Sequence, residues 1–379
     1  MTRPDERNQK AWSVVHMTSV HQPFDTRIFV KQCSSLARSG HRVALIACLG
    51  QDEDVNGVRV LGIARPGNRL WRMVMTPFAV LRRALSSRAA ICHFHDPELI
   101  PVGIALKLMG RRVIYDVHED LPKQITAKEW LHPLLRRPVA AIAGLVEWFA
   151  GRSLDHIVAA TPAIAEKFPA RKTTLVQNFP MADELSPAEP IPYDQRPRAV
   201  AYIGGISRIR GAQEMIDAFG ALQDTSVRLK LAGPFQSPGL QTELQASPGW
   251  DMTDYLGVLD REHVRTTLSA CRVGLVTFLP SPNHMMAYPN KMFEYMAAGV
   301  PVIASDFPLW RSIVEGAGAG LLVDPRRPEA IAAAVRWLIA NERAAAEMGQ
   351  RGREAVLEKF SWRSEERKLL HLYETLAAV

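Results

Sequence analysis

The chain has 379 residues, 47% of them hydrophobic, and a formal net charge of +7. This length exceeds what one hydrophobic core ordinarily supports, so we expect two domains. No apolar run reaches the roughly 18 residues needed to cross a bilayer, and the polar N-terminus lacks the apolar core of a signal peptide. We therefore expect a cytoplasmic protein, either soluble or peripheral on the inner face of the membrane, with four reduced cysteines.

The positive charge lies in the first half of the chain. Residues 1–178 hold 25 Lys and Arg against 15 Asp and Glu, and the remainder holds 21 against 24. Without a basic-aromatic cluster or a nucleic-acid motif, an anionic membrane surface is favoured over nucleic acid as the partner. Residues 69–88 and 130–137 mix apolar and Arg side chains. Such segments either lie in a lipid headgroup layer or pack on their own sheet with a solvated basic edge.

Short β-branched runs alternate with amphipathic stretches, which predicts parallel sheets covered by helices on both faces. Residues 1–12 are expected to form a flexible N-terminal segment. Residues 13–178 are expected to form a first, Rossmann-like domain with strands at 13–19, 42–48, 58–63, 90–94, 112–117, 156–160 and 174–177.

The stretch 179–197 is rich in Pro and acidic residues and has no periodicity, so we predict a linker. A second Rossmann-like domain is predicted over 198–360. Two terminal helices are expected after its last strand, and the second of them, 361–379, is expected to pack back toward the first domain. Ligands of such sheets bind at the carboxyl ends of strands, so we expect a cleft between the two domains. The predicted elements are strands at 199–203, 227–232, 253–257, 273–278, 300–304 and 319–323 and helices at 211–223, 239–246 and 261–270.

The segment from Tyr288 to Ser305 is the most informative part of the sequence. Pro289 pre-sets a first helical turn, Asn290 and Lys291 lie among its unpaired N–H groups, and Glu294 lies one turn further on. The N–H groups and Lys291 would meet an anion, and Glu294 would accept hydrogen bonds from a diol. These groups suit a nucleotide-sugar; the alternative is an ordinary capped helix with a surface Glu.

A second glycine-rich turn follows the strand predicted at 199–203. Gly204 and Gly205 precede Arg208 and Arg210, and this arrangement can bring N–H groups and guanidinium groups onto a diphosphate. The spacing matches neither the dinucleotide fingerprint nor a P-loop. Arg208 could also be an ordinary exposed loop residue.

Strand ends in the first half also carry polar side chains. His118 could accept or position a hydroxyl proton near neutral pH, or it could be a structural histidine. His93 and His95 could hold a metal with Asp96, but no further ligand set supports this, so we predict no metal. We expect His95 and Asp96 to line an acceptor side or to shape the turn at Pro97.

Arg27 lies in the first turn of a helix that Asp25 is predicted to cap. A cation at this position opposes the helix dipole, which favours an anionic partner for Arg27. An ion pair with Asp25 would explain the position equally well.

These residues resemble the retaining GT-B glycosyltransferases of the glycosyl transferases group 1 type. The likeness covers nearly the whole chain and is carried by the segments DTRIF, HFHDPEL, YDVHEDLP, AATPAIAEKF, YIGGISRIRG and PNKMFEYMAAGVPVIASD. It implies a nucleoside-diphosphate sugar in the second domain, an acceptor in the first, transfer with retention of anomeric configuration, and no obligatory metal or cofactor.

The resemblance also assigns roles to single residues. Glu294 matches the carboxylate that grips the donor ribose, Arg210 stands where the family has a Lys on the diphosphate, and His118 matches an active-site histidine. With Lys291, these are the expected catalytic residues. The acceptor side is expected to include Arg27, His95, Asp96 and Glu119.

Two positions depart from the family pattern. Met286 replaces a Glu near the donor sugar, so Asn283 or His284 would supply sugar contacts. Gly205 replaces an Arg, so Arg208 would supply the second guanidinium.

The sequence thus predicts an enzyme that moves a hexose from a nucleotide-sugar, UDP favoured over GDP, to a hydroxyl of a saccharide or polyprenyl-linked acceptor. The expected process is cell-surface polysaccharide synthesis, of exopolysaccharide or lipopolysaccharide. A non-catalytic nucleotide-sugar-binding protein and a nucleotide-sugar epimerase on the same fold are the alternatives.

Overall fold

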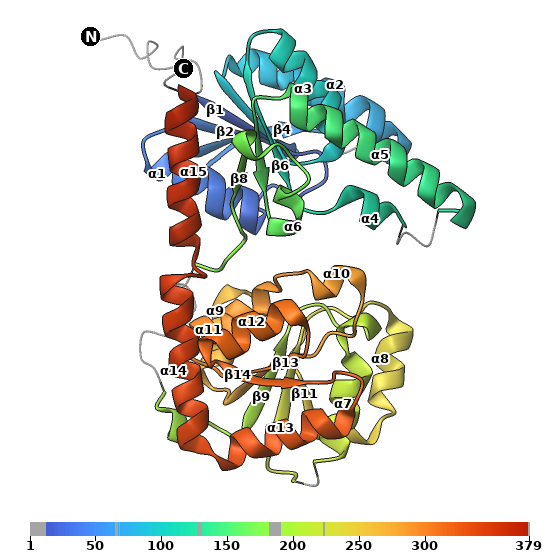
Figure 1. Ribbon diagram of the computed structural model, residues 1–379, viewed down its shortest axis with the longest axis vertical. Helices are drawn as coiled ribbons and strands as arrows, with labels where there is room; N and C mark the ends of the chain where they lie inside the picture. Colours follow the sequence, from blue (N-terminus) through green and yellow to red (C-terminus); the bar gives the residue numbers. More distant parts are fainter. Residues whose placement is uncertain are drawn as a thin grey trace. The chain divides into compact units, whose positions relative to one another are not determined.

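The computed structural model describes residues 13–64, 67, 69–126, 131–181, 191–222 and 224–377, and within the helix that starts at Arg69 it describes side chains from residue 75 on. The predicted segment 1–12, Trp130 and residues 182–190 of the predicted linker lie outside these residues. The chain divides into two compact units (Figure 1). Unit 1 contains the residues up to Asn178 and those from Glu365 onward, and unit 2 contains Phe179–Ser364.

Unit 1 is built on one sheet with the strands β1 (Val14–Met17), β2 (Val43–Cys48), β3 (Glu53–Val55), β4 (Val58–Ile63), β5 (Ile91–Phe94), β6 (Arg112–Val117), β7 (His156–Ala159) and β8 (Thr173–Leu175). Their order is β3-β4-β2-β1-β5-β6-β7-β8. All neighbouring strands are parallel except β3 and β4. Apart from β3, this is the doubly wound order, in which the direction of winding reverses between β1 and β5.

The edge strand β3 is absent from the predicted elements, because its polar residues suggest a loop. Two residues of the sequence could have revealed it. Asn56 and Gly57 join β3 to β4 with φ angles of 52° and 78°. An Asn-Gly pair with both φ angles positive is the preferred two-residue turn of an antiparallel hairpin.

The helices of unit 1 are η2 (Thr26–Cys33, a π-helix), α1 (Ser34–Arg38), α2 (Arg69–Ser87), η3 (Pro97–Leu99), α3 (Ile100–Leu108), α4 (Leu121–Thr126), α5 (Pro133–Ser153), α6 (Pro162–Ala165), η4 (Ala170–Lys172) and, from Glu365 onward, α15 (Trp362–Ala377). Figure 1 shows α2, α3 and α5 gathered on one side of the sheet. Val80 of α2 and Leu106 of α3 belong to the same buried cluster as Val15 and Cys92 of the strands.

Unit 2 contains a second sheet, with the strands β9 (Ala199–Ile203), β10 (Arg228–Ala232), β11 (Thr253–Tyr255), β12 (Val273–Val276), β13 (Val302–Ser305) and β14 (Gly320–Val323). The order is β11-β10-β9-β12-β13-β14, and all neighbouring strands are parallel. This is again the doubly wound order, with the reversal between β9 and β12. The prediction of two doubly wound parallel-sheet domains is confirmed.

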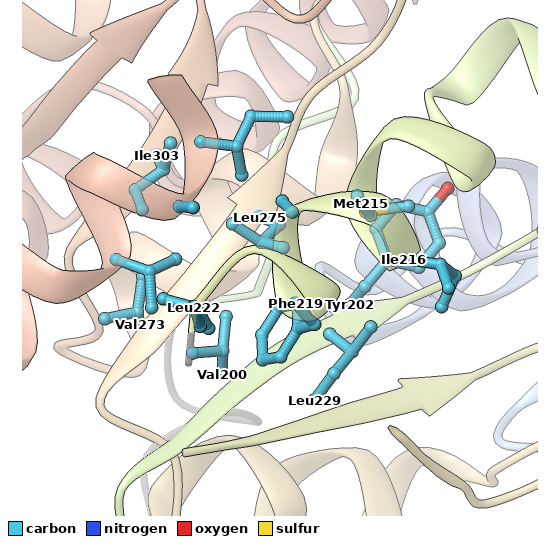
Figure 2. Close-up of a cluster of buried hydrophobic side chains, with 14 of the residues drawn as sticks. Val200, Tyr202, Met215, Ile216, Phe219, Leu222, Leu229, Val273, Leu275 and Ile303 are labelled. Atoms are coloured by element: carbon cyan, nitrogen blue, oxygen red, sulfur yellow. The ribbon is translucent and has the colours of Figure 1, made fainter. Parts of the chain in front are cut away.

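The helices of unit 2 are η6 (Tyr193–Gln195), η7 (Arg208–Arg210), α7 (Ala212–Gly220), α8 (Pro238–Gln245), η8 (Pro248–Met252), α9 (Arg261–Ser269), α10 (Pro282–Met285), α11 (Asn290–Ala297), α12 (Pro308–Ala317), α13 (Pro328–Ala340) and α14 (Glu342–Glu358). In Figure 2, Met215 and Phe219 of α7 pack over Val200, Leu229 and Leu275 of the sheet. This packing fixes the loop that joins β9 to α7.

Two expectations about the helices of this half are wrong. Helix α12 was not expected, although Pro308 opens it and Gly318, with φ +59°, ends it. Three helices instead of two follow β14, because α13 and α14 are separate helices that meet at Asn341. None of the described helices combines the length and apolar character needed to cross a membrane.

Candidate functional site

The loop after β9 lies where the sheet of unit 2 reverses its winding, and two glycines with positive φ angles, Gly204 and Gly211, determine its path. Gly204 has φ +129°, and its N–H donates to the carbonyl of Ala232 at 2.8 Å. Gly211, with φ +74°, lies against the end of β12, where an added Cβ would be 2.1 Å from the carbonyl oxygen of Thr277. The loop can therefore approach β12 this closely only because residue 211 has no side chain.

Lys291, on the first turn of α11, is a buried cation beside this loop. Its side chain lies among aromatic rings, with Nζ 3.4 Å from the ring centroid of Tyr202 and 5.4 Å from that of Phe278. Nζ makes no hydrogen bond to any described residue. Burial, reinforced by the charge of Arg210, lowers the pKa of Lys291 well below its ordinary value. Ring faces attract an ammonium group but do not replace a hydrogen-bond acceptor.

Arg210 is the second cation of this cluster. Its Nη1 donates to the carbonyl of Gly205 at 3.1 Å, and its guanidinium lies 5.6 Å from the ring centroid of Phe278. A Cβ on Gly205 would be 2.7 Å from Nη1, so the glycine leaves room for the guanidinium. We call Gly204, Gly205, Arg210 and Lys291 the cation cluster. Its two positive side chains lie near each other, and Nζ of Lys291 lacks a hydrogen-bond acceptor among the described residues.

Arg208 is placed differently from Arg210. It is exposed and pairs with Glu243 of α8. Its expected contact with a diphosphate stays a prediction, and such a contact requires Arg208 to exchange this carboxylate for the ligand.

Glu294 lies one turn beyond Lys291 on α11. Its Oε1 accepts a hydrogen bond from Nη1 of Arg261 at 2.7 Å, and its side chain is 19% exposed. Arg261 begins α9 and was missed by the sequence analysis, because no motif connects residues 33 positions apart. The pair orients the carboxylate and leaves Oε2 free of this hydrogen bond.

The remaining expected donor-side positions lie between residues 283 and 290, before or at the start of α11, and differ in exposure. Asn283, Met286 and Asn290 are exposed. Nδ1 of His284 lies 3.0 Å from the carbonyl of Leu279, so this nitrogen carries the proton. Their contacts with a sugar stay predictions.

In unit 1, Asp116 at the end of β6 is the centre of the polar interior. Arg27 donates to both of its oxygens, from Nη2 to Oδ1 at 2.7 Å and from Nε to Oδ2 at 3.2 Å, and Gln32 donates to Oδ2 at 2.6 Å. Burial would raise the pKa of Asp116, but the charge of Arg27 and hydrogen bonds outweigh burial and hold the pKa well below its ordinary value.

This pair corrects the expectation for Arg27. Asp25 does cap the helix, accepting from the N–H groups of Arg27 and Ile28 at 2.8 and 2.9 Å. The side chain of Arg27, however, is buried and pairs with Asp116 instead of with Asp25 or an outside anion. Arg27 therefore belongs to the interior of unit 1 and not to a ligand-facing surface.

Asp96 is also used internally. Its Oδ2 accepts from Oγ1 of Thr18 and N of Ser19, both at 2.7 Å, and its Oδ1 lies 2.9 Å from Nδ1 of His21. Burial would raise the pKa of Asp96, but these hydrogen bonds outweigh it and hold the pKa well below its usual range. Asp96 therefore fixes the loop after β1, and neither lines an acceptor side nor mainly shapes the turn at Pro97.

His95 and His118 lie together at Asp116. Oδ2 of Asp116 is 3.2 Å from Nδ1 of His95 and 3.3 Å from Nε2 of His118. His95 is buried, the side chain of His118 is 17% exposed, and Glu119 is exposed. Of the expected residues in unit 1, His118 is therefore the one that combines buried polar support with access to solvent.

Two further residues of this network were missed by the sequence analysis. His16 of β1 lies with Nδ1 2.9 Å from Nε2 of His95, and the hydroxyl of Tyr373 in α15 lies 3.1 Å from Nε2 of His16 and 2.7 Å from Nδ1 of His93. The separation of 357 residues between His16 and Tyr373 gives no sequence signal.

The possible metal ligands in unit 1 differ from those considered in the sequence. Atoms of His93, His95 and Asp116, not Asp96, lie within 4.8 Å of one another. Because Arg27 and Gln32 already donate to Asp116, this carboxylate is committed to protein donors. The absence of a metal requirement stays a prediction.

Both halves of the chain match models of sugar-transferring enzymes. Residues 197–341 match the model described as Glycosyl transferases group 1, and residues 26–178 match the Glycosyl transferase 4-like domain. The chain belongs to the group 1 glycosyltransferases. Two relatives of this glycosyltransferase are the D-rhamnosyltransferase WbpZ of Pseudomonas aeruginosa and the MMP alpha-(1->4)-mannosyltransferase of Mycolicibacterium hassiacum. WbpZ is 25% identical over 71% of this chain and 69% of its own, and the mannosyltransferase is 22% identical over 75% and 70%.

Solved structures with the same fold include sucrose-phosphate synthase from Thermosynechococcus elongatus, with a TM-score of 0.77, 20% identity, and coverage of 96% of this chain and 99% of that one. Anabaena HepE, solved in complex with UDP and glucose, has a TM-score of 0.72 and 15% identity, covering 97% of this chain and all of its own (100%). These neighbours identify the fold of this glycosyltransferase as GT-B.

Gly211→Ala should destabilise unit 2 because it adds both left-handed strain and a clash with the carbonyl of Thr277. Gly257→Ala is the matched control, since Gly257 has φ +72° and nothing within 4 Å of an added Cβ. We expect the control to cost about 1 kcal/mol and Gly211→Ala clearly more, measured by urea unfolding. Equal losses would show that the loop can move away from β12 at no cost.

The folded protein should lose stability as the pH falls from about 6.5 to 4. Burial lowers the pKa of His16 and His93 and brings that of His95 to about 4, so the unfolded chain binds protons that the folded chain excludes. Urea midpoints measured through this range should fall, and His16→Gln should reduce the slope.

His371→Gln, which replaces an exposed histidine outside the buried cluster, serves as the control for the substitution itself. Two groups act against the trend, because a raised pKa in the folded state adds stability on acidification. The hydrogen bond to Asp96 and the nearby carboxylates outweigh burial and raise the pKa of His21, and burial raises the pKa of Glu147 to about 7. A midpoint that stays constant from pH 7 to pH 5 would contradict the prediction.

Proposed function

We propose that this glycosyltransferase moves a hexose from a nucleoside-diphosphate sugar, UDP favoured over GDP, to a hydroxyl of a saccharide or polyprenyl-linked acceptor, with retention of anomeric configuration and without a metal. The observation that carries the proposal is the buried Nζ of Lys291, which lies beside Arg210 and the glycine loop and has no hydrogen-bond partner in the described part of the chain. A diphosphate supplies the acceptor oxygens and the negative charge that this cluster lacks.

The proposed mechanism uses the cation cluster where charge develops. When the bond from the sugar to the diphosphate breaks, negative charge grows on the departing phosphate oxygens. Arg210, Lys291 and the N-terminus of α11 would stabilise that charge without reorganising. Arg210 and Lys291 would then neutralise the charge of the departing diphosphate, a role that a bound metal ion plays in metal-dependent enzymes.

The other residues would orient the two substrates. Glu294, held by Arg261, would accept hydrogen bonds from the donor ribose, and Arg208 would join the phosphate after leaving Glu243. In unit 1, His118 would hold the incoming hydroxyl, whose proton the departing phosphate can take in a front-face displacement. Asn283 and His284 would contact the sugar in place of the carboxylate that Met286 replaces.

The proposal for the donor draws support from the neighbours. HepE was solved with UDP and with UDP-glucose, and the two relatives named above transfer rhamnose and mannose. We further propose that the enzyme works in cell-surface polysaccharide synthesis as a peripheral protein on the inner membrane face, which fits the basic first half of the chain.

A second candidate is a protein that binds a nucleotide-sugar without transferring it. Met286 favours this reading, since an exposed thioether occupies the position of a family carboxylate. Release of UDP or GDP from a panel of UDP- and GDP-hexoses, followed by mass analysis, separates the candidates. Transfer changes the mass of the acceptor, epimerisation leaves the donor mass unchanged, and binding alone gives no product.

Lys291→Met should separate ligand binding from stability. Removing an unpartnered buried ammonium should leave the unfolding midpoint unchanged or raised. Losing one charge-assisted hydrogen bond, about 1.5–3 kcal/mol, should weaken UDP binding about 10- to 100-fold by calorimetry.

Lys230→Met is the control, since Lys230 pairs with Asp254 at the surface of unit 2 and lies outside the cation cluster. It should bind UDP as the parent does. Parent-like donor turnover by an Arg210→Ala/Lys291→Ala double variant would refute the phosphate assignment.

A further inference from the structure

Helix α5 leaves an unusual apolar surface uncovered. Its buried residues are confined to Ala140, Glu147, Ala150 and Gly151. Gly151 lies so close to Phe168 that an added Cβ would be 2.5 Å from that ring. The α5 apolar face consists of eight large side chains that are 38–79% exposed: Leu134, Leu135, Val139, Ile142, Leu145, Val146, Trp148 and Phe149.

These side chains form two adjacent stripes along the helix. Residues 135, 139, 142, 146 and 149 follow the i, i+3, i+4 spacing of one face, and residues 134, 145 and 148 lie on the next. A helix of 21 residues is about 31 Å long. An apolar face of this length is far more than the single exposed hydrophobic residues of an ordinary surface.

The charges of α5 are all positive where solvent reaches them. Arg137 and Arg152 are exposed toward its two ends, and the guanidinium of Arg152 stacks 3.9 Å from the ring centroid of Trp148. The only acidic residue of α5, Glu147, is buried and shares a hydrogen bond with the hydroxyl of Tyr115. Burial raises the pKa of Glu147 to about 7.

We propose that the α5 apolar face docks on an anionic lipid bilayer, lying in the headgroup layer without crossing it. Arginines and a tryptophan around an apolar helix face are the pattern of interfacial helices. A second copy of the chain fits less well, since α5 offers no exposed carboxylate to receive the arginines of another α5. This inference deepens the proposed function: if the acceptor is lipid-linked, the enzyme would meet it at this surface.

Flotation with vesicles tests the proposal without measuring transfer. The parent should bind vesicles of phosphatidylglycerol and phosphatidylcholine, and bind pure phosphatidylcholine or high-salt samples at least tenfold less. Ile142→Ser/Leu145→Ser/Phe149→Ser should lower the partition coefficient at least tenfold and keep the parent unfolding midpoint, because these side chains are exposed. Arg137→Gln/Arg152→Gln should weaken the preference for the anionic lipid.

Leu108→Ser/Met109→Ser is the matched control, since both side chains are exposed on unit 1 but lie outside α5. It should bind vesicles as the parent does. Parent-like binding by the triple variant, or no binding of the parent to anionic vesicles, overturns the proposal. So does a dimer in sedimentation velocity that the triple variant abolishes, because the occupant of the face would then be a second copy.

Discussion

The desolvated ammonium of Lys291 is the constraint on which the candidate donor site depends. An isolated charge in a protein interior is costly unless it is paired. Here the folding of α11 against β9 places Nζ over the ring of Tyr202, and no described residue offers a hydrogen bond to it. The cost is offset by burial elsewhere in unit 2, and the proposed diphosphate is the partner that would remove it.

Unit 1 treats a buried charge in the opposite way. Asp116 is as deeply placed as Lys291, yet Arg27 and Gln32 saturate it, and two histidines complete its surroundings. A buried carboxylate held by several donors in this way is restricted to one conformation. Its product is an oriented imidazole, His118, at the boundary between the interior and solvent.

The two sheets share a topology but differ at the point where their winding reverses. In unit 1, Asp96 after β5 accepts hydrogen bonds from Thr18 and Ser19 after β1. The protein's own side chains therefore occupy the place where the winding of this sheet reverses. In unit 2, the glycines of the loop after β9 lie beside Arg210 and Lys291, and Nζ of Lys291 has no hydrogen-bond partner among the described residues. The same fold therefore has a closed polar core at the reversal in unit 1 and, in unit 2, the place where we propose that an anion binds.

The sequence by itself determined the two parallel sheets, most of their strands and the glycine loop and helix that carry the cation cluster. The spacing of hydrophobic residues, the residues that form turns and the residues that cap helices are local features, so they can be recognised from neighbouring residues. Only the tertiary structure decided where Arg27 and Asp96 point, and that Tyr373 and His16 join the histidines. Burial and pairing depend on contacts across 70 to 360 residues, roughly, which no local pattern encodes. The apolar face of α5 was likewise visible only once the packing of α5 within unit 1 showed which of its side chains remain exposed.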